Sequence, residues 1–335
     1  MPSKIARPPG AGRRGLLAAA GLAALARPAL AQQGFPDRPV RFVVPSSAGS
    51  GVDLLTRVLA DCMARQSGRA FLVDNRPGAA SAIGTQHVAR QPADGYTLLY
   101  GGPNITILQV MNSSFAREID VRTAFAPITI AASGPYVFVV NNELPVRTVP
   151  ELIAWLHANP GRGNYATTGI GATMHLMSEL FRQLAGNPAV TMVPYRSDGP
   201  AVQAVASGEV QYAIAVSGTA KPLVDSGLVR ALAVTGPRRM AGLPEVPTIT
   251  EVGVITEFDI VAWLGYFAPA GTPPERVAWV QRAIALALYD EGVQARLADL
   301  GFAPVGSEPA ALRAVVERDV ALWTRVAKAA GLSPL

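Results

Sequence analysis

Strand-like apolar runs alternate with helical patterns along most of this chain, and this alternation constrains its fold more than any other feature. The expected strands of the first half lie at 40–44, 71–75, 96–100, 127–132 and 136–141. Those of the second half lie at 164–167, 190–194, 210–216, 230–235 and 260–269, before a mostly helical tail from Pro274. Strands and helices at this spacing are typical of βαβ units, so they predict an α/β fold with a mostly parallel sheet.

The length of the chain predicts more than one structural unit. About 300 residues follow residue 31, which exceeds the ~100–200 residues of a usual domain, so two lobes are expected. Cys62 is the only cysteine, so no disulfide can form within the chain. It lies three residues after Leu59 in a helical pattern, which predicts a thiol buried on the apolar face of that helix.

Residues 1–31 have the pattern of an export signal. Arg13 and Arg14 precede the apolar stretch "GLLAAAGLAALA", and small residues ending at Ala31 form a cleavage site. The apolar stretch is shorter than the ~20 residues that span a membrane. The paired arginines favour the twin-arginine route, with an ordinary export signal as the alternative. We therefore expect a periplasmic protein that is cleaved near Ala31.

The positive charge of the chain comes from this segment. The whole chain has 29 Lys and Arg against 24 Asp and Glu. The basic residues of the signal are Lys4, Arg7, Arg13, Arg14 and Arg27. Their removal leaves 24 basic and 24 acidic residues, so the rest of the chain is neutral. Nucleic-acid binding requires a basic patch on the folded domain, and we therefore expect no nucleic-acid partner.

Motifs for nucleotide binding, metal binding and catalysis fail on inspection. The loop "PSSAGSG" at 45–51 lacks the lysine of a phosphate-binding loop, and its Gly49-x-Gly51 lacks the third glycine of a dinucleotide site. His175 and Glu179 lie four residues apart without a third metal ligand nearby, so His175 is expected to cap a helix or bind ligand. No G-x-S-x-G occurs. The expectation is no catalytic residue, no metal and no cofactor.

Six loops that follow expected strands share one chemistry. Ligands of open α/β sheets bind at the carboxyl ends of the strands. These loops are rich in Gly, Ser, Thr and Asn, and they lie at 45–51, 76–81, 101–104, 167–175, 196–200 and 217–219. Several lead into helices, whose first N–H groups lack internal partners and bear the positive end of the helix dipole. The loops therefore predict an anion held by backbone and hydroxyl groups.

Several long segments resemble the solute receptors of tripartite tricarboxylate transporters, the Bug-type proteins. The similar segments include "VDNRPGAASAIGTQHVARQPADGYTLLYG" (73–101), "NYATTGIGATMHLMSELF" (164–181) and "VPYRSDGPAVQAVASGEVQYAIA" (193–215). The resemblance implies a type II periplasmic-binding-protein fold, with two α/β lobes joined by two crossing strands. It places lobe 1 at 35–136 plus 264–335 and lobe 2 at 137–263. It also implies a monomer without enzyme activity that delivers an organic anion to an inner-membrane permease.

The resemblance further implies that the ligand carboxylate is gripped between the loop Ser46–Gly51 and the loop Thr167–His175. Together with the other loops, this makes the candidate ligand-binding residues Ser46, Ser47, Ala48, Gly49, Ser50, Gly51, Gly78, Ala79, Ser81, Gly102, Asn104, Thr167, Thr168, Gly169, Gly171, Ala172, Thr173, His175, Tyr195, Arg196, Ser217, Gly218, Thr219 and Trp263. For Trp263, packing in the core is the alternative to lining a cleft.

Departures from the family pattern bear on the ligand. Ser46 replaces a usual aromatic residue, which indicates a more polar or roomier pocket. Val216–Thr219 replaces a common Asp-Asn pair, which favours a mono- or dicarboxylate without an amine. Transport of that carboxylate is the leading hypothesis. A receptor that signals through a sensor protein is the alternative, and an exported hydrolase is the least favoured, because no activated nucleophile is visible.

Overall fold

The computed structural model describes residues 34–255 and 257–333. The expected export signal at 1–31 lies outside the described residues. The chain divides into two units, Met1–Asp37 and Arg38–Leu335. Residues 34–37 are the described part of the first unit and contain no helix or strand, so every described element belongs to the second unit.

The first half-sheet is built around a parallel core. β1 (Val40–Val44) pairs in parallel with β2 (Phe71–Asn75) on one side and with β3 (Thr97–Gly101) on the other. β9 (Val261–Pro269) then lies antiparallel to β3. The other elements of this half are α2 (Gly51–Ser67), η2 (Ala79–Ser81), α3 (Ala82–Ala89), α4 (Pro103–Met111), α5 (Ser113–Glu118), α10 (Pro274–Ala287), α11 (Glu291–Asp299) and β10 (Ala303–Pro304).

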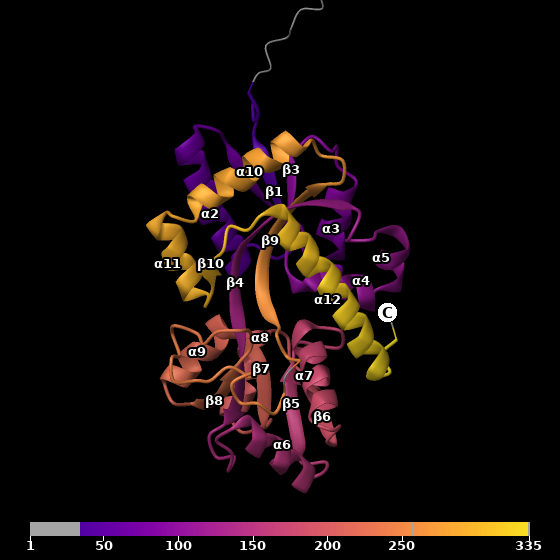
Figure 1. The fold of residues 1–335 in the computed structure, drawn as a ribbon, viewed down its shortest axis with the longest axis vertical. Helices are drawn as coiled ribbons and strands as arrows, with labels where there is room; N and C mark the ends of the chain where they lie inside the picture. Colours follow the sequence, from indigo (N-terminus) through magenta and orange to yellow (C-terminus); the bar gives the residue numbers. More distant parts are fainter. Residues whose placement is uncertain (1–33, 256, 334–335) are drawn as a thin grey trace, which may run out of the picture. The chain divides into compact units, whose positions relative to one another are not determined.

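One long strand, β4 (Phe125–Asn141), belongs to both halves of the sheet (Figure 1). Its residues up to Pro135 pair with β9, and those from Tyr136 pair with β7 and β8. The prediction of two strands, at 127–132 and 136–141, is therefore wrong. Gly134 and Pro135 look like a turn in the sequence, but here they are extended. A side chain at 134 would meet the Gly301 carbonyl oxygen at 2.5 Å, so close packing explains the glycine.

The second half-sheet orders its strands β4-β7-β5-β6, and β8 pairs with β4. β5 pairs in parallel with β6 and β7, whereas β4 is antiparallel to β7 and β8. The expectation of a mostly parallel sheet is thus wrong for the centre, because the strands that connect the halves run against their neighbours. The elements are α6 (Val149–Ala158), β5 (Gly163–Thr167), α7 (Thr173–Leu184), β6 (Val190–Pro194), α8 (Asp198–Ala206), β7 (Tyr212–Val216), α9 (Ser217–Asp225) and β8 (Val229–Val234).

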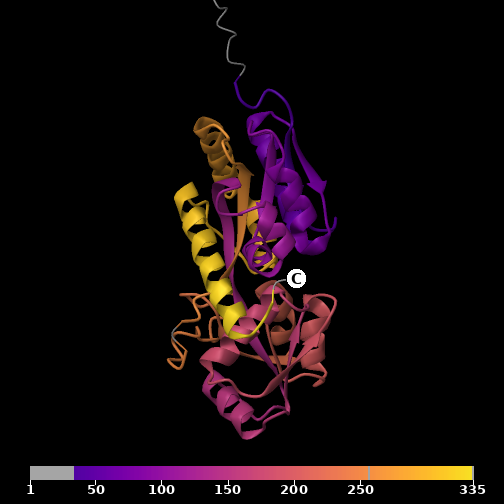
Figure 2. The ribbon, with the colours of Figure 1, turned by 90° about the vertical axis from the view of Figure 1, so that its right-hand side faces the viewer.

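The molecule thus has two α/β lobes, which we call the first lobe (β1, β2, β3 and β9) and the second lobe (β5 to β8). The chain passes to the second lobe along β4 and returns along β9. Figures 1 and 2 show α12 (Pro309–Ala329), in yellow, running from the first lobe to the second. It contacts α4, β4 and α7. Among the described residues, no helix is long and apolar enough to cross a membrane.

Local predictions about single residues can also be compared with this fold. Thr148 caps α6, because its side chain accepts a hydrogen bond from the Glu151 N–H. Cys62 is buried on α2, which confirms the core-thiol prediction. The helices α4 and α5 were not expected. Every turn of α4 is buried, so it has no polar face and therefore no amphipathic period that would reveal it.

Candidate ligand-binding site

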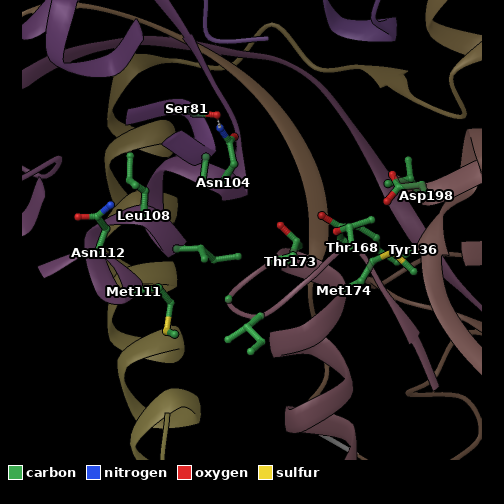
Figure 3. Close-up of a pocket in the computed structure, with 16 residues that line it drawn as sticks. Ser81, Asn104, Leu108, Met111, Asn112, Tyr136, Thr168, Thr173, Met174 and Asp198 are labelled. Carbon is green, nitrogen blue, oxygen red and sulfur yellow. Dashed lines mark hydrogen bonds between the residues drawn. The ribbon is translucent and has the colours of Figure 1, made fainter. Parts of the chain in front are cut away.

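A cavity of about 340 Å³ lies between the two lobes (Figure 3). The first lobe contributes residues of η2 and α4, and the second contributes the loop before α7 together with the starts of α7 and α8. Tyr136 lines it from β4, at the point where that strand passes from one half-sheet to the other. Both lobes and their connection therefore contribute to one cavity.

Helices α4 and α7 begin at this cavity without a side-chain cap, at the N-cap residues Gly102 and Ala172. The starts of α8 and α9 at the cavity are also uncapped, but the first turn of α8 carries the carboxylate of Asp198. Outside the cavity both kinds of helix start occur: Ser50 and Thr148 cap α2 and α6, whereas α10 and α12 begin without a side-chain cap. The first N–H groups of an α-helix have no partner within the helix and carry its positive dipole end. An anion in the cavity would supply the acceptors that the starts of α4 and α7 lack.

His175 organises the loop in front of α7. The buried ring accepts a hydrogen bond through Nδ1 from the Gly171 N–H, at 3.0 Å. Burial lowers the pKa of His175, although the nearby Glu179 carboxylate acts in the opposite direction. The lowered pKa favours the neutral ring, whose Nδ1 can accept a hydrogen bond. Gly171 has a φ of 74°, a left-handed conformation that glycine adopts without strain. His175 therefore fixes the conformation of the loop by this hydrogen bond without lining the cavity itself, whereas Gly171 lines the cavity.

The first-lobe wall combines a polar corner with an apolar surface. Asn104 donates a hydrogen bond from Nδ2 to Ser81 Oγ at 2.8 Å (Figure 3). Ser81 and its neighbours Ala79 and Ala80 have φ values of 81°, 46° and 50°, which are strained for residues other than glycine. Leu108 of α4 makes part of the apolar surface. This wall suits a short carbon chain with a polar end.

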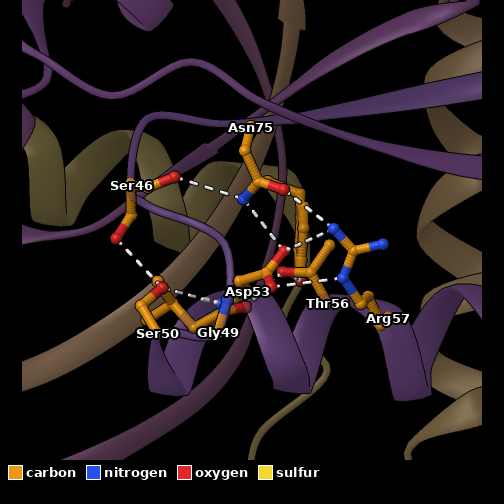
Figure 4. A network of polar contacts seen from close by, with 9 residues as sticks. Ser46, Gly49, Ser50, Asp53, Thr56, Arg57 and Asn75 are labelled. Carbon is orange, nitrogen blue, oxygen red and sulfur yellow. Dashed lines mark hydrogen bonds and ion pairs between the residues drawn. The ribbon is translucent and has the colours of Figure 1, made fainter.

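The loop 46–51 does not line this cavity, and several of its polar groups have partners within the first lobe. Its Gly49 N–H donates to Asp53 Oδ2 at 2.8 Å, and the Ser46 and Ser50 hydroxyls are 3.0 Å apart (Figure 4). Asn75 donates to the Ser46 carbonyl oxygen at 3.2 Å and to Asp53 Oδ1 at 2.9 Å. In this arrangement the loop is held by the carboxylate of Asp53, which lies in the first turn of α2.

The predicted site residues fall into two sets. Those that line the cavity are Ser81, Asn104, Thr168, Gly171, Ala172 and Thr173. Those that do not are Ser46, Ser47, Ala48, Gly49, Ser50, Gly51, Gly78, Ala79, Gly102, Thr167, Gly169, His175, Tyr195, Arg196, Ser217, Gly218, Thr219 and Trp263. Of the second set, Ser217 donates to the Gly301 carbonyl oxygen at 3.0 Å. Trp263 lies in the first-lobe core and donates from Nε1 to Asp319 Oδ2 at 2.9 Å. Their roles in ligand binding stay predictions.

Sequence reasoning missed the apolar lining and one charged residue. The missed lining residues are Ala80, Ile107, Leu108, Met111, Asn112, Tyr136, Ile170, Met174, Asp198 and Val216. Most of them are apolar and resemble core residues in the sequence. Asp198 carried a usable signal, because it is one of few charged residues in the loops after the strands. No group of three or more His, Cys, Asp or Glu that could hold a metal occurs in residues 34–255 and 257–333.

Comparison with known proteins gives consistent matches over most of the chain. Residues 55–332 match the model of the tripartite tricarboxylate transporter family receptor. Protein BugT of Bordetella pertussis is 32% identical over 297 residues, which cover 89% of this chain and 90% of that protein. Among solved structures, R. palustris Rpa4515 with adipate is 34% identical, with a TM-score of 0.76 over 90% of this chain and 100% of the other. MatC from Rhodopseudomonas palustris with bound malate is 29% identical, with a TM-score of 0.72 over 87% and 99%.

Proposed function

Because the chain belongs to the tripartite tricarboxylate transporter receptor family, we propose that it captures a small organic carboxylate in the cavity between its lobes. The members of this family are solute-binding receptors and not enzymes. The observation that carries the proposal is that the uncapped starts of α4 and α7, neither of which has an acidic residue in its first turn, meet at one cavity. Backbone N–H groups hold an anion without a buried cation, whose desolvation would offset much of the Coulomb attraction.

Two observations support a short mono- or dicarboxylate as the ligand. The first is the lining itself, in which Leu108 and Met111 offer apolar contact beside the polar groups of Ser81 and Asn104. The second is that two structural relatives are solved with adipate and with malate, both dicarboxylates. These relatives share the fold of this chain, and their ligands support a carboxylate as the chemical class of its ligand.

Membership of the family supports a proposal for the cellular role. We propose that residues 1–31 direct export to the periplasm and are removed near Ala31. There the monomeric receptor closes on its ligand and delivers it to an inner-membrane permease of the tripartite tricarboxylate type. Closure of two lobes around the cavity excludes water from the bound carboxylate and strengthens its hydrogen bonds.

Thermal unfolding of the purified protein with a panel of mono- and dicarboxylates tests the proposal. A ligand at ~100 times its dissociation constant stabilises the folded state by about 2.7 kcal/mol. For a protein of this size we expect the melting temperature to rise by about 5–10 °C. If no carboxylate in a broad panel that includes adipate and malate shifts the melting temperature, the proposed function is wrong.

A pair of substitutions tests the position of the carboxylate. Thr173→Glu places a negative charge at the start of α7 inside the cavity and is expected to abolish binding by charge repulsion. Thr250→Glu makes the same chemical change at an exposed position outside the cavity and should leave the affinity unchanged. Ser50→Glu tests the loop 46–51 separately, because loss of binding in that variant would assign the ligand to the loop.

A further inference from the structure

The carboxylate of Asp198 faces the cavity and has no part in the anion site described above. In the described part of the chain, Asp198 is the one charged residue that lines the cavity. It is half-buried and is the first residue of α8. Figure 3 shows it beside Tyr136 and beyond Thr168, on the side of the cavity away from Leu108. The cavity therefore has an acidic end.

Within the part of the chain that the structure describes, the oxygens of Asp198 have no protein partner. No hydrogen bond or ion pair joins its side chain to another group in residues 34–255 and 257–333. The more deeply buried Asp53 and Asp319, by contrast, both accept hydrogen bonds from protein donors. Burial raises the pKa of Asp198, which is the effect of removing a carboxylate from water without giving it a donor. Burial and then the charge of Asp198 raise the pKa of Tyr136, so the two groups lie close enough to interact.

The helix dipole explains only part of this arrangement. An acidic residue in the first turn is favourable because the N-terminus of a helix is positive. The dipole does not supply hydrogen bonds to the carboxylate oxygens of Asp198, which face the cavity and can be reached by a donor there. A ligand that occupies the cavity is the natural source of the missing donors.

The two ends of the cavity call for different groups on the ligand. The uncapped start of α7 and the polar corner formed by Ser81 and Asn104 suit a carboxylate. Leu108 and Met111 suit a short carbon chain. A second ligand carboxylate next to Asp198 would bring two like charges together, whereas an N–H or O–H group there would complete the hydrogen bonding of its oxygens.

We propose that Asp198 accepts a hydrogen bond from an N–H or O–H group at the far end of the bound carboxylate. The preferred ligand is then a short carboxylate that bears a distal hydroxyl, amide or ammonium group, and a plain dicarboxylate binds less tightly. This inference rests on the proposed function, because it takes the cavity to be the carboxylate site. It revises the expectation of a ligand without an amine, which relied on the residues at 216–219 alone.

Calorimetric titration with four six-carbon acids tests the inference. The acids are hexanoate, adipate, 6-hydroxyhexanoate and 6-aminohexanoate, a chain length chosen because one structural relative is solved with adipate. The wild-type protein should bind the hydroxy and amino acids about tenfold more tightly than adipate, the gain expected from one hydrogen bond to a charged group. Asp198→Asn should tighten adipate binding and remove the advantage of 6-aminohexanoate. Asp61→Asn, an equal charge change at an exposed position of α2, should keep the wild-type ranking.

The outcomes separate this inference from the proposed function. If adipate or hexanoate binds the wild-type protein as tightly as the two donor-bearing acids do, the carboxylate site stands and the role of Asp198 is wrong. An unchanged ranking in Asp198→Asn has the same meaning. If that variant does not fold, the wild-type ranking alone decides. If neither these acids nor malate bind, the proposed function fails and this inference fails with it.

Discussion

The carboxylate of Asp53 holds the loop 46–51 against α2, and its removal is a demanding test of the structure. Asp53 is 1% exposed and accepts hydrogen bonds from the Gly49 N–H at 2.8 Å, Asn75 Nδ2 at 2.9 Å and Arg57 Nε at 3.2 Å (Figure 4). Asp53→Asn keeps the shape but turns one acceptor oxygen into a donor. That new NH₂ group must face either the Gly49 N–H or the Asn75 amide, both of which are donors.

The expected cost follows from these contacts. A buried polar group left without its hydrogen bond costs about 1–3 kcal/mol. The ion pair with Arg57 adds less than about 1 kcal/mol, because the Arg57 side chain is 45% exposed and screened by water. We therefore expect Asp53→Asn to lower the free energy of unfolding by about 1–4 kcal/mol. In a protein of this size the melting temperature should fall by about 2–4 °C for each kcal/mol lost.

The pH dependence supplies a second, independent readout. Burial alone would raise the pKa of Asp53, but hydrogen bonds from Arg57, Gly49 and Asn75 outweigh it and lower the pKa. Because the pKa is lower in the folded than in the unfolded state, the stabilisation is complete above the unfolded value of about 3.9 and is lost as the pH falls through the folded value. The stability difference between wild type and variant should therefore shrink below about pH 4.

Thermal and urea unfolding from neutral to acidic pH measure both effects. Asp61→Asn is the matched control, because Asp61 lies on the same helix and is exposed. It should change the melting temperature by no more than about 1 °C, since exposed substitutions seldom exceed 0.5 kcal/mol. A loss for Asp53→Asn as small as that of the control, or a loss that persists unchanged in acid, would refute the role assigned to Asp53.

Three further perturbations follow from the packing. Gly218→Ala should lower the free energy of unfolding by about 1–3 kcal/mol in urea melts, because its Cβ would lie 2.6 Å from the Leu300 carbonyl oxygen; Gly199→Ala, with nothing within 4 Å, should not destabilise. Ala80→Gly should raise the free energy of unfolding by about 0.5–1 kcal/mol, because glycine adopts the φ of 50° without strain, at some cost in backbone entropy. A lower free energy of unfolding in this variant would contradict the strain at Ala80. Cys62 is 1% exposed, so a thiol reagent should label it only on unfolding, and rapid labelling of the native protein would contradict its burial.

Much of the fold could be predicted because local patterns and packing agree. β2 and β6 begin and end where the sequence predicts, since their apolar runs are followed by turn-forming residues. α4 escaped prediction because it is buried along its length, so no polar face marks it as a helix. β4 escaped because Gly134 and Pro135 signal a turn in isolation, whereas pairing with β9 keeps them extended.

The site was predictable only in its polar half. Loops after strands that carry Gly, Ser and Thr led to Ser81, Asn104 and the residues before α7. The apolar lining could not be found in this way, because residues such as Leu108 and Met111 have the same sequence character as core residues. Trp263 is the opposite case, a residue expected at the site that lies in the core of the first lobe. Its aromatic side chain alone does not reveal whether it faces a cleft or a core. Three-dimensional packing decides such cases.

The place of β9 in the sheet has a consequence for biosynthesis. β9 lies between β3 and β4, although it follows β4 by more than a hundred residues in the chain. While the protein is being made, β3 and β4 therefore present unpaired edges until the chain reaches Pro269, and such edges can pair with other molecules. Strands β5 to β8, in contrast, lie consecutively between Gly163 and Val234. The second lobe should thus assemble first, and the newly made chain is most prone to aggregate just before β9 arrives.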